Sequence, residues 1–414
     1  MNEEKQKFRL TSLERAWILY DVGNSAFVLL VATLIPIFFN ALAEGGGLSS
    51  VEYLAYWGYA ASAVTVITAV LSPILGTLAD TRNFKKPIFT FCVAVGVIGC
   101  CAMGMASTWL PFLLIFIFAK VGFSGSLVFY DSMLSDVTVP DRMDEVSSKG
   151  YAWGYIGSCV PFVVCLALVL GAGSIGISQM TALNLALFIT AAWWLVTTLP
   201  LLRQYKQVHF VEVQEHAIRQ SFARIGHTLR HLKEDRQVFW FLLAFFCYID
   251  GVYTIIDMAT AYGTALGLDT TGLLLALLVT QIVAFPSALV FGRLSGQYPS
   301  DTLIPVCIAA YAGIALFAFF LKHQWQFWVL AVVVGMFQGG IQALSRSHFA
   351  KIIPPEKSGE YFGLFDICGK GASFLGTMIV SVGSQLTGSA NVGVGSLIVL
   401  FIVGFVLFRV SDRK

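Results

Sequence analysis

The sequence predicts an all-α polytopic membrane protein with twelve transmembrane helices in two pseudo-symmetric six-helix halves. Its 414 residues are 57% hydrophobic and only 12% charged, and the mean hydropathy is +0.77, whereas soluble domains are about 25% charged. Apolar runs of about 20 residues, long enough to cross a bilayer, recur along the whole chain. Segments of the first half are also echoed in the second.

Each predicted helix corresponds to one apolar run. In chain order the runs cover 15–40, 52–79, 87–108, 111–135, 149–171, 178–201, 237–263, 270–293, 301–321, 325–349, 359–386 and 392–410. Pro36, Pro73, Pro161 and Pro286 each lie inside one of these runs. We expect bends at these prolines, since neighbouring helices can satisfy the backbone groups that a proline frees.

Basic residues predict the orientation in the membrane. Of the 26 Lys and Arg residues, 23 lie on one side of the predicted helices, Lys120 and Lys370 lie within helices, and Lys322 lies on the other side. By the positive-inside rule, both termini and the middle loop are cytoplasmic. We therefore expect a multi-pass protein of the plasma (inner) membrane.

The long polar segment in the middle divides the chain. Residues 1–201 are predicted to form one six-helix bundle, 202–236 a cytoplasmic linker and 237–414 the second bundle. Four apolar residues of the linker share one helical face, namely Ile218, Phe222, Ile225 and Leu229. This pattern indicates an amphipathic helix on the inner membrane surface. Its histidines are a candidate pH sensor, although a solvated linker face is the simpler interpretation.

The two halves repeat each other. "LYDVGNSAF" in the first helix aligns with "YIDGVYTII" in the seventh, which sets Asp21 against Asp250. The segments after the second and eighth helices align Gly76 with Gly292. Parallel repeats of six helices around a site at the midplane are the build of major facilitator transporters. Short outer loops and a long loop between the halves fit that build.

The segment 76–87 is a candidate gate. It resembles the major facilitator loop after the second helix in having a glycine, an aspartate and basic residues, although "TRNF" replaces the usual Arg-x-Gly-Arg core. In that superfamily the loop holds the halves in one gating state, so Asp80 and Arg82, with Lys85 and Lys86, are candidate gating residues. A basic cluster that only fixes the orientation is the alternative.

Polar side chains inside the predicted helices mark a candidate transport path, because ionisable groups are costly in a membrane. In the major facilitator build, the first, fourth, seventh and tenth helices line the cavity, and here all four carry a polar stripe on one face. The stripe residues are Asp21, Asn24, Ser25, Lys120, Ser124, Asp131, Ser135, Asp250, Tyr253, Thr254, Asp257, Gln338, Gln342, Ser345 and Arg346. The third, sixth, ninth and twelfth helices are nearly free of charge, as lipid-facing helices should be.

Several charged groups have two interpretations. Asp366 and Lys370 of the eleventh helix are spaced i, i+4, so they form either a self-contained structural pair or part of the site. Asp131, Asp136 and Arg346 lie near the predicted cytoplasmic helix ends. At that position, salt bridges of a gate or interface are favoured over contacts with a substrate.

Asp21 and Asp250 are the candidates for a direct transport role, while Asn24 either joins them or satisfies a neighbouring helix backbone. A buried carboxylate can take up a proton and so release a basic partner such as Arg346 or Lys120. Release of the partner changes which gating state is the more stable one. Proton coupling is a hypothesis, and nothing in the sequence excludes a uniporter. A substrate with both a cationic and an anionic group would find complements here.

The residues also resemble a known family. "YDVGNSAF" is similar to the Tyr-Asp-x-Ala-Asn-Ser-Ala-aromatic signature of the vacuole-effluxer family of major facilitators, whose best-known members are the fungal autophagy-related amino-acid effluxers. Further similar segments are "FYDSML" at 129–134, "SSKGYAWGYIG" at 147–157, "YIDGVYTII" at 248–256, "GGIQALSRSHFAKIIP" at 339–354 and "YFGLFDICGKGASFLG" at 361–376. The resemblance covers nearly the whole chain.

The resemblance implies a major facilitator fold and efflux of small solutes, with amino acids as the named class. Gly23 stands where the family usually has alanine, and the long insertions of fungal members are absent, so the chain resembles a compact bacterial member. By matching position, the resemblance implies functional roles for Asp21, Asn24, Asp131, Asp250, Gln342, Arg346, Asp366 and Lys370.

The predicted function is secondary active transport of a small polar or zwitterionic, amino-acid-like solute by alternating access. A transporter or flippase for an amphiphile, such as a lysolipid, is the alternative, since 14% of the residues are aromatic. Aromatic residues are also ordinary lipid-facing material. A scaffold or receptor without transport activity would not need paired charges inside the bilayer.

Other functions lack support in the sequence. We find no nucleophile elbow, metal-ligand cluster or phosphate-binding loop, and the eight cysteines fall in apolar runs, as small buried side chains do. The net charge of +2 gives no basis for binding nucleic acid. We therefore expect no enzyme activity and no cofactor or metal. The expected partners are a small-molecule substrate, the lipid bilayer and, on the coupling hypothesis, protons. By analogy with other major facilitators, we expect a monomer.

Overall fold

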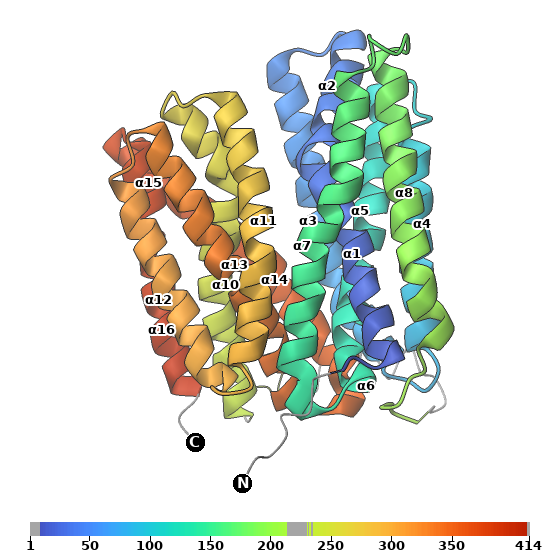
Figure 1. Cartoon of the computed structure of the whole chain (residues 1–414), viewed down its shortest axis with the longest axis vertical. Coiled ribbons are helices and arrows are strands. Elements are labelled where there is room, and N and C mark those ends of the chain that lie inside the picture. The colour runs from blue at the N-terminus through green and yellow to red at the C-terminus, as the bar shows by residue number, and fades with distance from the viewer. Residues whose placement is uncertain (1–8, 213–229, 231, 233–234, 412–414) are drawn as a thin grey trace.

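The computed structural model describes residues 9–212, 230, 232 and 235–411. Within its helices, the side chains at 50, 51, 54, 260, 261, 264, 265, 270, 271, 274 and 370–374 lie outside the description. The described chain is almost entirely helical (Figure 1). The amphipathic helix predicted in the linker falls largely on 213–229, which lie outside the described residues.

The first group of helices runs from the first predicted span to the start of the linker. Its elements are α1 (Ser12–Ala32), α2 (Leu34–Gly45), α3 (Ser50–Ala79), α4 (Lys85–Met103), α5 (Trp109–Ser132), α6 (Leu134–Val137), η1 (Pro140–Arg142), α7 (Met143–Leu170) and α8 (Gln179–Gln204). A capping box opens α1, in which Thr11 accepts from the Glu14 backbone N–H and Glu14 accepts from that of Thr11. This box fixes where the first span begins.

The first predicted span is two helices rather than one. It breaks at Thr33, between α1 and α2. The ring of Pro36 would clash with the carbonyl four residues earlier, which is that of Ala32, so the regular helix ends there. The other three prolines lie inside helices that continue past them, namely Pro73 in α3, Pro161 in α7 and Pro286 in α11.

The second group of helices follows the linker. Its elements are α10 (Arg236–Ala265), α11 (Thr270–Leu294), α12 (Ser300–Phe319), α13 (Gln324–Ile352), η2 (Pro355–Lys357), α14 (Ser358–Thr387), α15 (Ala390–Gly395) and α16 (Ile398–Ser411). The last predicted span is again divided, here between α15 and α16. The run 111–135 passes the end of α5 and enters α6. The remaining predicted runs each correspond to one helix, with ends that differ by up to about six residues.

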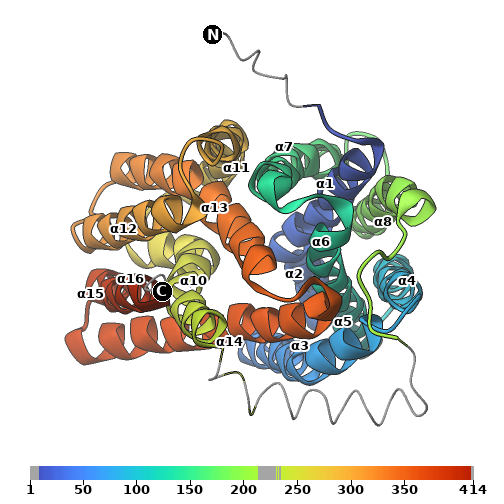
Figure 2. The same ribbon diagram turned by 90° about the horizontal axis from the view of Figure 1, so that it is seen from below.

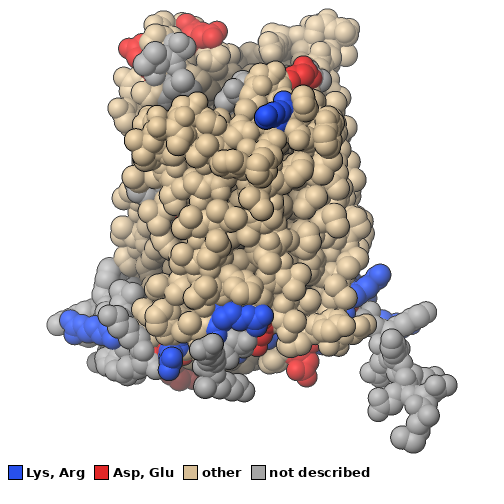
Figure 3. Space-filling model, turned by 90° about the vertical axis from the view of Figure 1, so that its left-hand side faces the viewer, with Lys and Arg blue, Asp and Glu red and all other residues tan. Residues whose placement is uncertain are grey.

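The helices have the length and composition of membrane spans. Among the described residues, 11 helical segments are long and apolar enough to cross a bilayer. The eleventh predicted run falls on α14, a helix of 30 residues that contains the undescribed side chains 370–374. The all-α polytopic fold is therefore confirmed, and the count of twelve is consistent with it. On the face in Figure 3, charged side chains gather at the two ends and leave a wide uncharged belt.

The helices lie in two groups, α1–α8 and α10–α16. The start of α1 and the end of α16 lie at one end of the molecule, here named the terminal end (Figures 1 and 2). The most extensive contacts between the groups are those of α3 with α14 and of α7 with α11 and α13, and α5 also packs on α14. The predicted boundaries of the two bundles and the linker stay a prediction. The packing of the two groups against each other brings the polar stripes of α1, α5 and α13 together.

Candidate transport site and gate

Arg346 of α13 lies where the two groups of helices meet. Its side chain is only 2% exposed. One guanidinium nitrogen, Nη1, lies 3.0 Å from Oδ1 of Asp131 on α5 and 3.6 Å from Oδ2 of Asp21 on α1. A guanidinium of the second group is thus shared by two carboxylates of the first. Buried charges are stable only when they are paired and hydrogen-bonded, so these three residues depend on one another.

The rest of the guanidinium is satisfied by α7 and by aromatic rings. Nε donates to the Ser147 hydroxyl at 2.9 Å and Nη2 to the Ser147 carbonyl at 3.0 Å. The guanidinium carbon lies 4.3 Å from the ring centre of Tyr151 and 4.7 Å from that of Trp17, within range of a cation–π attraction. A Cβ at Gly150 would lie 3.1 Å from Nη2 and 2.9 Å from Asp21 Oδ2. The small residue on α7 therefore leaves room for this ion pair.

Asp21 is held by its own helix and by α5 as well as by Arg346. The Tyr130 hydroxyl donates to Asp21 Oδ2 at 3.0 Å, and Asn24 Nδ2 lies 3.4 Å from Asp21 Oδ1. Asn24 also donates to the Tyr20 carbonyl at 3.0 Å, in its own helix. The backbone that Asn24 satisfies is thus that of α1, whereas the sequence suggested a neighbouring helix.

Asp250, the repeat partner of Asp21, has a different environment. Its Oδ1 accepts the Gly376 backbone N–H of α14 at 2.9 Å and the Thr254 hydroxyl at 3.3 Å. Asp250 is fully buried, and its Oδ2 has no hydrogen-bond partner within the part of the chain that the structure describes. A Cβ at Gly376 would lie 2.7 Å from the carboxylate. Asp250 therefore ties α10 to α14 within the second group, whereas Asp21 joins the two groups.

The other stripe residues spread away from this cluster toward the end opposite the termini. Gln342 Oε1 accepts from the Tyr155 hydroxyl at 3.4 Å, and Gln338 is 5% exposed. Tyr253 is half-buried and Asp257 is exposed on α10. Lys120 lies over the ring of Phe123, with Nζ 4.7 Å from its centre. The structure thus places these residues along the same helices, beyond the ion pairs that Arg346 makes with Asp131 and Asp21.

Asp366 of α14 pairs across the two groups. It accepts the Ser72 hydroxyl of α3 at 2.7 Å. The Lys370 side chain lies outside the described residues, so the predicted pair of Asp366 with Lys370 stays a prediction. The contact with α3 places Asp366 on the seam that joins α3 to α14.

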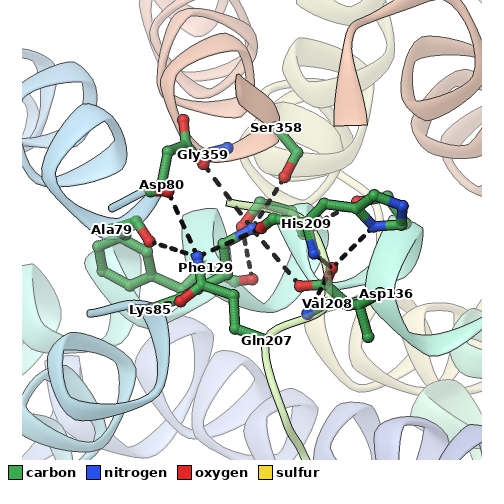
Figure 4. A network of polar contacts seen from close by, with 12 residues as sticks. Ala79, Asp80, Lys85, Phe129, Asp136, Gln207, Val208, His209, Ser358 and Gly359 are labelled. Atoms are coloured by element: carbon green, nitrogen blue, oxygen red, sulfur yellow. Dashed lines mark hydrogen bonds and ion pairs between the residues drawn. The ribbon is translucent and has the colours of Figure 1, made fainter. Parts of the chain in front are cut away.

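Asp80 caps a helix of the opposite group. It follows α3, and its two carboxylate oxygens accept the backbone N–H groups of Gly359 at 2.7 Å and Glu360 at 2.8 Å, in the first turn of α14 (Figure 4). Lys357, at the N-cap position of α14, makes no side-chain cap bond itself. A carboxylate at a helix N-terminus is stabilised by the unpaired N–H groups and by the helix dipole. Asp80 thus supplies from α3 the cap that α14 lacks.

Lys85, rather than Arg82, is the buried basic partner at this candidate gate. Lys85 Nζ lies 3.8 Å from Asp80 and 3.7 Å from Asp136, and it donates to the Ser358 hydroxyl of α14 at 2.8 Å. Arg82 is 53% exposed and pairs with Glu212 at 3.3 Å. The sequence named both residues as basic members of the loop, and only the fold separates them.

Asp136 of α6 anchors the first residues of the linker. It accepts the Tyr205 hydroxyl at 2.5 Å and the His209 backbone N–H at 2.9 Å, and its Oδ1 lies 3.0 Å from the His209 ring nitrogen Nδ1 (Figure 4). Although burial alone would raise it, the hydrogen bond with His209 and the charge of Lys85 hold the pKa of Asp136 below its usual value. The hydrogen bond to Asp136 raises the pKa of His209.

The segment 205–212, here named the strap, also pairs with the loop after α3. Val211 donates to the Asp80 carbonyl at 2.8 Å, and Arg82 donates through its backbone to the Val211 carbonyl at 3.1 Å. Because this segment was predicted to belong to a cytoplasmic linker, Tyr205 and His209 were not among the candidate residues. No local pattern marks them, because their partner Asp136 lies about 70 residues earlier.

Further contacts close the terminal end between the groups. Lys351 of α13 donates to Asp144 of α7 at 2.5 Å, and the Ser147 hydroxyl donates to the Ala343 carbonyl at 2.8 Å. A Cβ at Gly76 would lie 2.1 Å from the Gly359 carbonyl oxygen, so α3 and α14 touch through their backbones. The described state is therefore closed at the terminal end.

Comparison with known proteins identifies the family. The family model described as "Vacuole effluxer Atg22 like" matches residues 12–138 and 135–414. The chain belongs to the Atg22-like vacuole effluxer family. The resemblance found in the sequence is thereby confirmed, and the family places the chain among membrane transporters of the major facilitator type.

Individual relatives agree with this assignment. An uncharacterized MFS-type transporter of Bacillus subtilis (strain 168), YxiO, is 42% identical over 404 residues, which cover 96% of this chain and 94% of that protein. Autophagy-related protein 22 of Coccidioides immitis (strain RS) is 25% identical over 315 residues, 65% of this chain and 51% of that protein. The chain thus spans about half the length of this fungal relative.

Solved structures show the same fold. The human organic anion transporter MFSD10 (TETRAN) superposes with a TM-score of 0.72 at 13% identity, covering 96% of this chain and 98% of that one. The effluxer family and the relatives are transporters rather than enzymes.

Proposed function

We propose that this chain moves a small polar or zwitterionic solute across the membrane by alternating access, as a secondary active transporter. The observation that carries the proposal is the buried cluster in which Arg346 of one group of helices is shared by Asp131 and Asp21 of the other. A cluster of this kind holds both groups together only while its charges are paired with one another. Any ligand that competes for these charges changes the stability of the closed terminal end relative to the open one.

A zwitterionic solute has the two groups that compete here. Its carboxylate can pair with the Arg346 guanidinium, and its ammonium can pair with the freed Asp131 or Asp21 carboxylate. Both exchanges weaken the direct contact between α13 and the first group. The solute would therefore replace protein–protein ion pairs with protein–ligand ion pairs, which permits the terminal end to open.

Proton coupling follows from the same arrangement. A proton that neutralises Asp131 or Asp21 also releases Arg346, so proton uptake and substrate binding act on one equilibrium. Asp250, with one carboxylate oxygen that has no partner among the described residues, is a further proton-binding candidate. By the distribution of basic residues, the closed terminal end faces the cytoplasm, so the described state would receive substrate from the opposite side.

Uptake into proteoliposomes tests this function. Wild type and Asp131→Asn would be compared on a mixed pool of amino acids and betaines, with and without an inward proton gradient. We expect gradient-stimulated uptake of one polar solute in wild type and its loss in Asp131→Asn. Asp269→Asn is the matched control, because Asp269 caps α11 at the opposite end and asparagine also caps helices. Equal uptake by wild type and Asp131→Asn would remove the cluster from the transport cycle.

An amphiphile is the second candidate substrate. A pocket inside the second group of helices, lined almost wholly by apolar side chains and reaching Gln338, favours it. The two candidates share a charged head and differ in whether the substrate also carries an apolar chain.

A further inference from the structure

We infer that the apolar pocket of the second group holds a single apolar chain of the transported substrate, so that the substrate is a zwitterionic head joined to one alkyl or acyl chain. This inference rests on the proposed transport function and selects the second candidate substrate, the amphiphile. It is drawn from the lining, the length and the polar inner end of the pocket.

The lining of the pocket is apolar. It lies among α10, α11, α12 and α13, with Val380 of α14 and Val394 of α15 also in its lining. It contains about 700 Å³ of space free of atoms, part of which is open to the outside. Typical lining residues are Ile255, Met258, Leu277, Leu330 and Val334. No charged side chain lines it among the described residues. A wholly polar solute would gain nothing from this surface, whereas an apolar chain would leave water on entering it.

The pocket is elongated along the helices. On α13 its lining residues run from Phe327 to Gln338, which is about 16 Å at a rise of 1.5 Å per residue. On α10 they run from Thr254 to Tyr262, which is about 12 Å. A slot of this length parallel to the helices fits an extended chain better than a compact side group.

The inner end of the pocket is polar. Gln338 lines it, is only 5% exposed, and has no partner for Oε1 within the described part of the chain. Buried polar atoms are normally hydrogen-bonded, so this amide oxygen leaves an acceptor available at the end of the pocket. Thr254, which donates to Asp250, lines the same end. The pocket therefore ends where hydrogen-bonding groups begin.

The polar end connects the pocket to the charged cluster. Gln338, Gln342 and Arg346 are spaced four residues apart on α13 and so lie on one helical face. Arg346 lies about 12 Å along the helix from Gln338. A substrate whose zwitterionic head lies along this face, toward Arg346, would direct its chain past Gln338 into the pocket.

A series of zwitterions with one head and chains of increasing length tests the inference. The probes are glycine betaine and its N-butyl and N-octyl analogues, bound to purified full-length protein in nanodiscs and measured by calorimetry. Burying one methylene increases affinity by about fourfold relative to water. We expect affinity to rise at least tenfold from the methyl to the octyl probe in wild type.

Two variants localise the effect. Ala331→Phe fills the pocket from α13, whereas Val329→Phe adds the same side chain on the exposed face of that helix. We expect Ala331→Phe to bind glycine betaine as wild type does and to lose the dependence on chain length, and Val329→Phe to keep it. Because all three proteins are measured in the same nanodiscs, partition of the probes into the lipid is the same for each. It therefore cannot cause a difference between the proteins. Thermal unfolding of each protein checks that the variants fold.

The outcomes separate the inference from the proposed function. Binding of glycine betaine with no dependence on chain length, or with the same dependence in Ala331→Phe, overturns the inference alone. Failure of every probe to bind overturns the zwitterionic substrate and the inference with it. A photoreactive phosphatidylcholine in the nanodisc provides the last arm. If it labels 327–338 and the octyl probe does not displace it, the pocket belongs to bilayer lipid and the inference is wrong.

Discussion

Arg346 and Asp131 form an ion pair between the two groups of helices, with 3.0 Å between Nη1 and Oδ1. The pair joins α13 to α5 inside the molecule, and Asp21 lies 3.6 Å from the same nitrogen. Because the three groups are buried together, removing one of them leaves the others without full compensation. The pair therefore connects the stability of the closed terminal end to whatever binds at the cluster.

Arg346→Lys should abolish most transport although it keeps the charge. A lysine ammonium is a point charge and cannot donate to Asp131 and Ser147 in the forked geometry of the guanidinium while it also lies beside Asp21. We expect the initial uptake rate to fall by more than about tenfold, which corresponds to about 1.4 kcal/mol. Arg293→Lys, at an exposed position, is the control. Wild-type uptake by Arg346→Lys would show that the fork has no role in transport.

Gly76→Val should prevent closure of the terminal end. A Cβ at Gly76 would lie 2.1 Å from the Gly359 carbonyl oxygen, and backbone atoms cannot move aside as a flexible side chain can. We expect the variant to fold but to stay open at the terminal end, with uptake reduced at least about tenfold. Gly58→Val, in the same helix with open space around it, is the control. Distances between spin labels at the terminal end give the measurement, and an unchanged distance distribution would contradict it.

Asp80→Asn should loosen the first turn of α14. The amide keeps one acceptor oxygen, so it can accept from only one of the Gly359 and Glu360 N–H groups, and it no longer pairs with Lys85. Losing a hydrogen bond to a charged group costs about 1.5–3 kcal/mol. We expect hydrogen exchange at these two amides to accelerate by tenfold or more. Asp269→Asn on α11, the control, should leave the exchange rates of both amides unchanged. If Asp80→Asn also leaves these rates unchanged, the contact does not stabilise the closed state.

Docking of the strap should depend on pH through His209 and Asp136. The His209 pKa is raised above its usual 6.5, so its contribution is fully present below about pH 6.5 and is lost as pH rises through the raised value. The Asp136 pKa is lowered, so its contribution is present above its usual 3.8 and is lost as pH falls through the lowered value. The strap should dock best between these limits.

Nuclear magnetic resonance of the histidine rings measures this dependence. The signal of His209, assigned with His209→Gln, should titrate above pH 6.5 in wild type and return toward 6.5 in Asp136→Asn. The charge of Glu356 also raises the pKa of His209, whereas the charge of Lys85 lowers it. Glu356→Gln is therefore a second variant, and it should lower the His209 pKa slightly. A titration midpoint of His209 that is the same with and without Asp136 would disprove the coupling.

The sequence by itself determined the helices, their polar stripes and the family. Hydropathy and helical spacing are local properties, so Asp21, Asp131 and Arg346 could each be assigned to the inner face of a helix without knowledge of the fold. The break after Ala32 also follows from one residue, Pro36, although its position was not predicted.

Only the tertiary structure decided which of these groups meet. Arg82 and Lys85 are both basic residues of one loop, but only Lys85 lies buried between Asp80 and Asp136. Three further features join segments that lie far apart in the chain. They are the strap, the cap that Asp80 provides to α14, and the pocket beside Gln338. Burial and pairing depend on packing between distant segments, and the energy of a charge depends on that environment rather than on its neighbours in sequence.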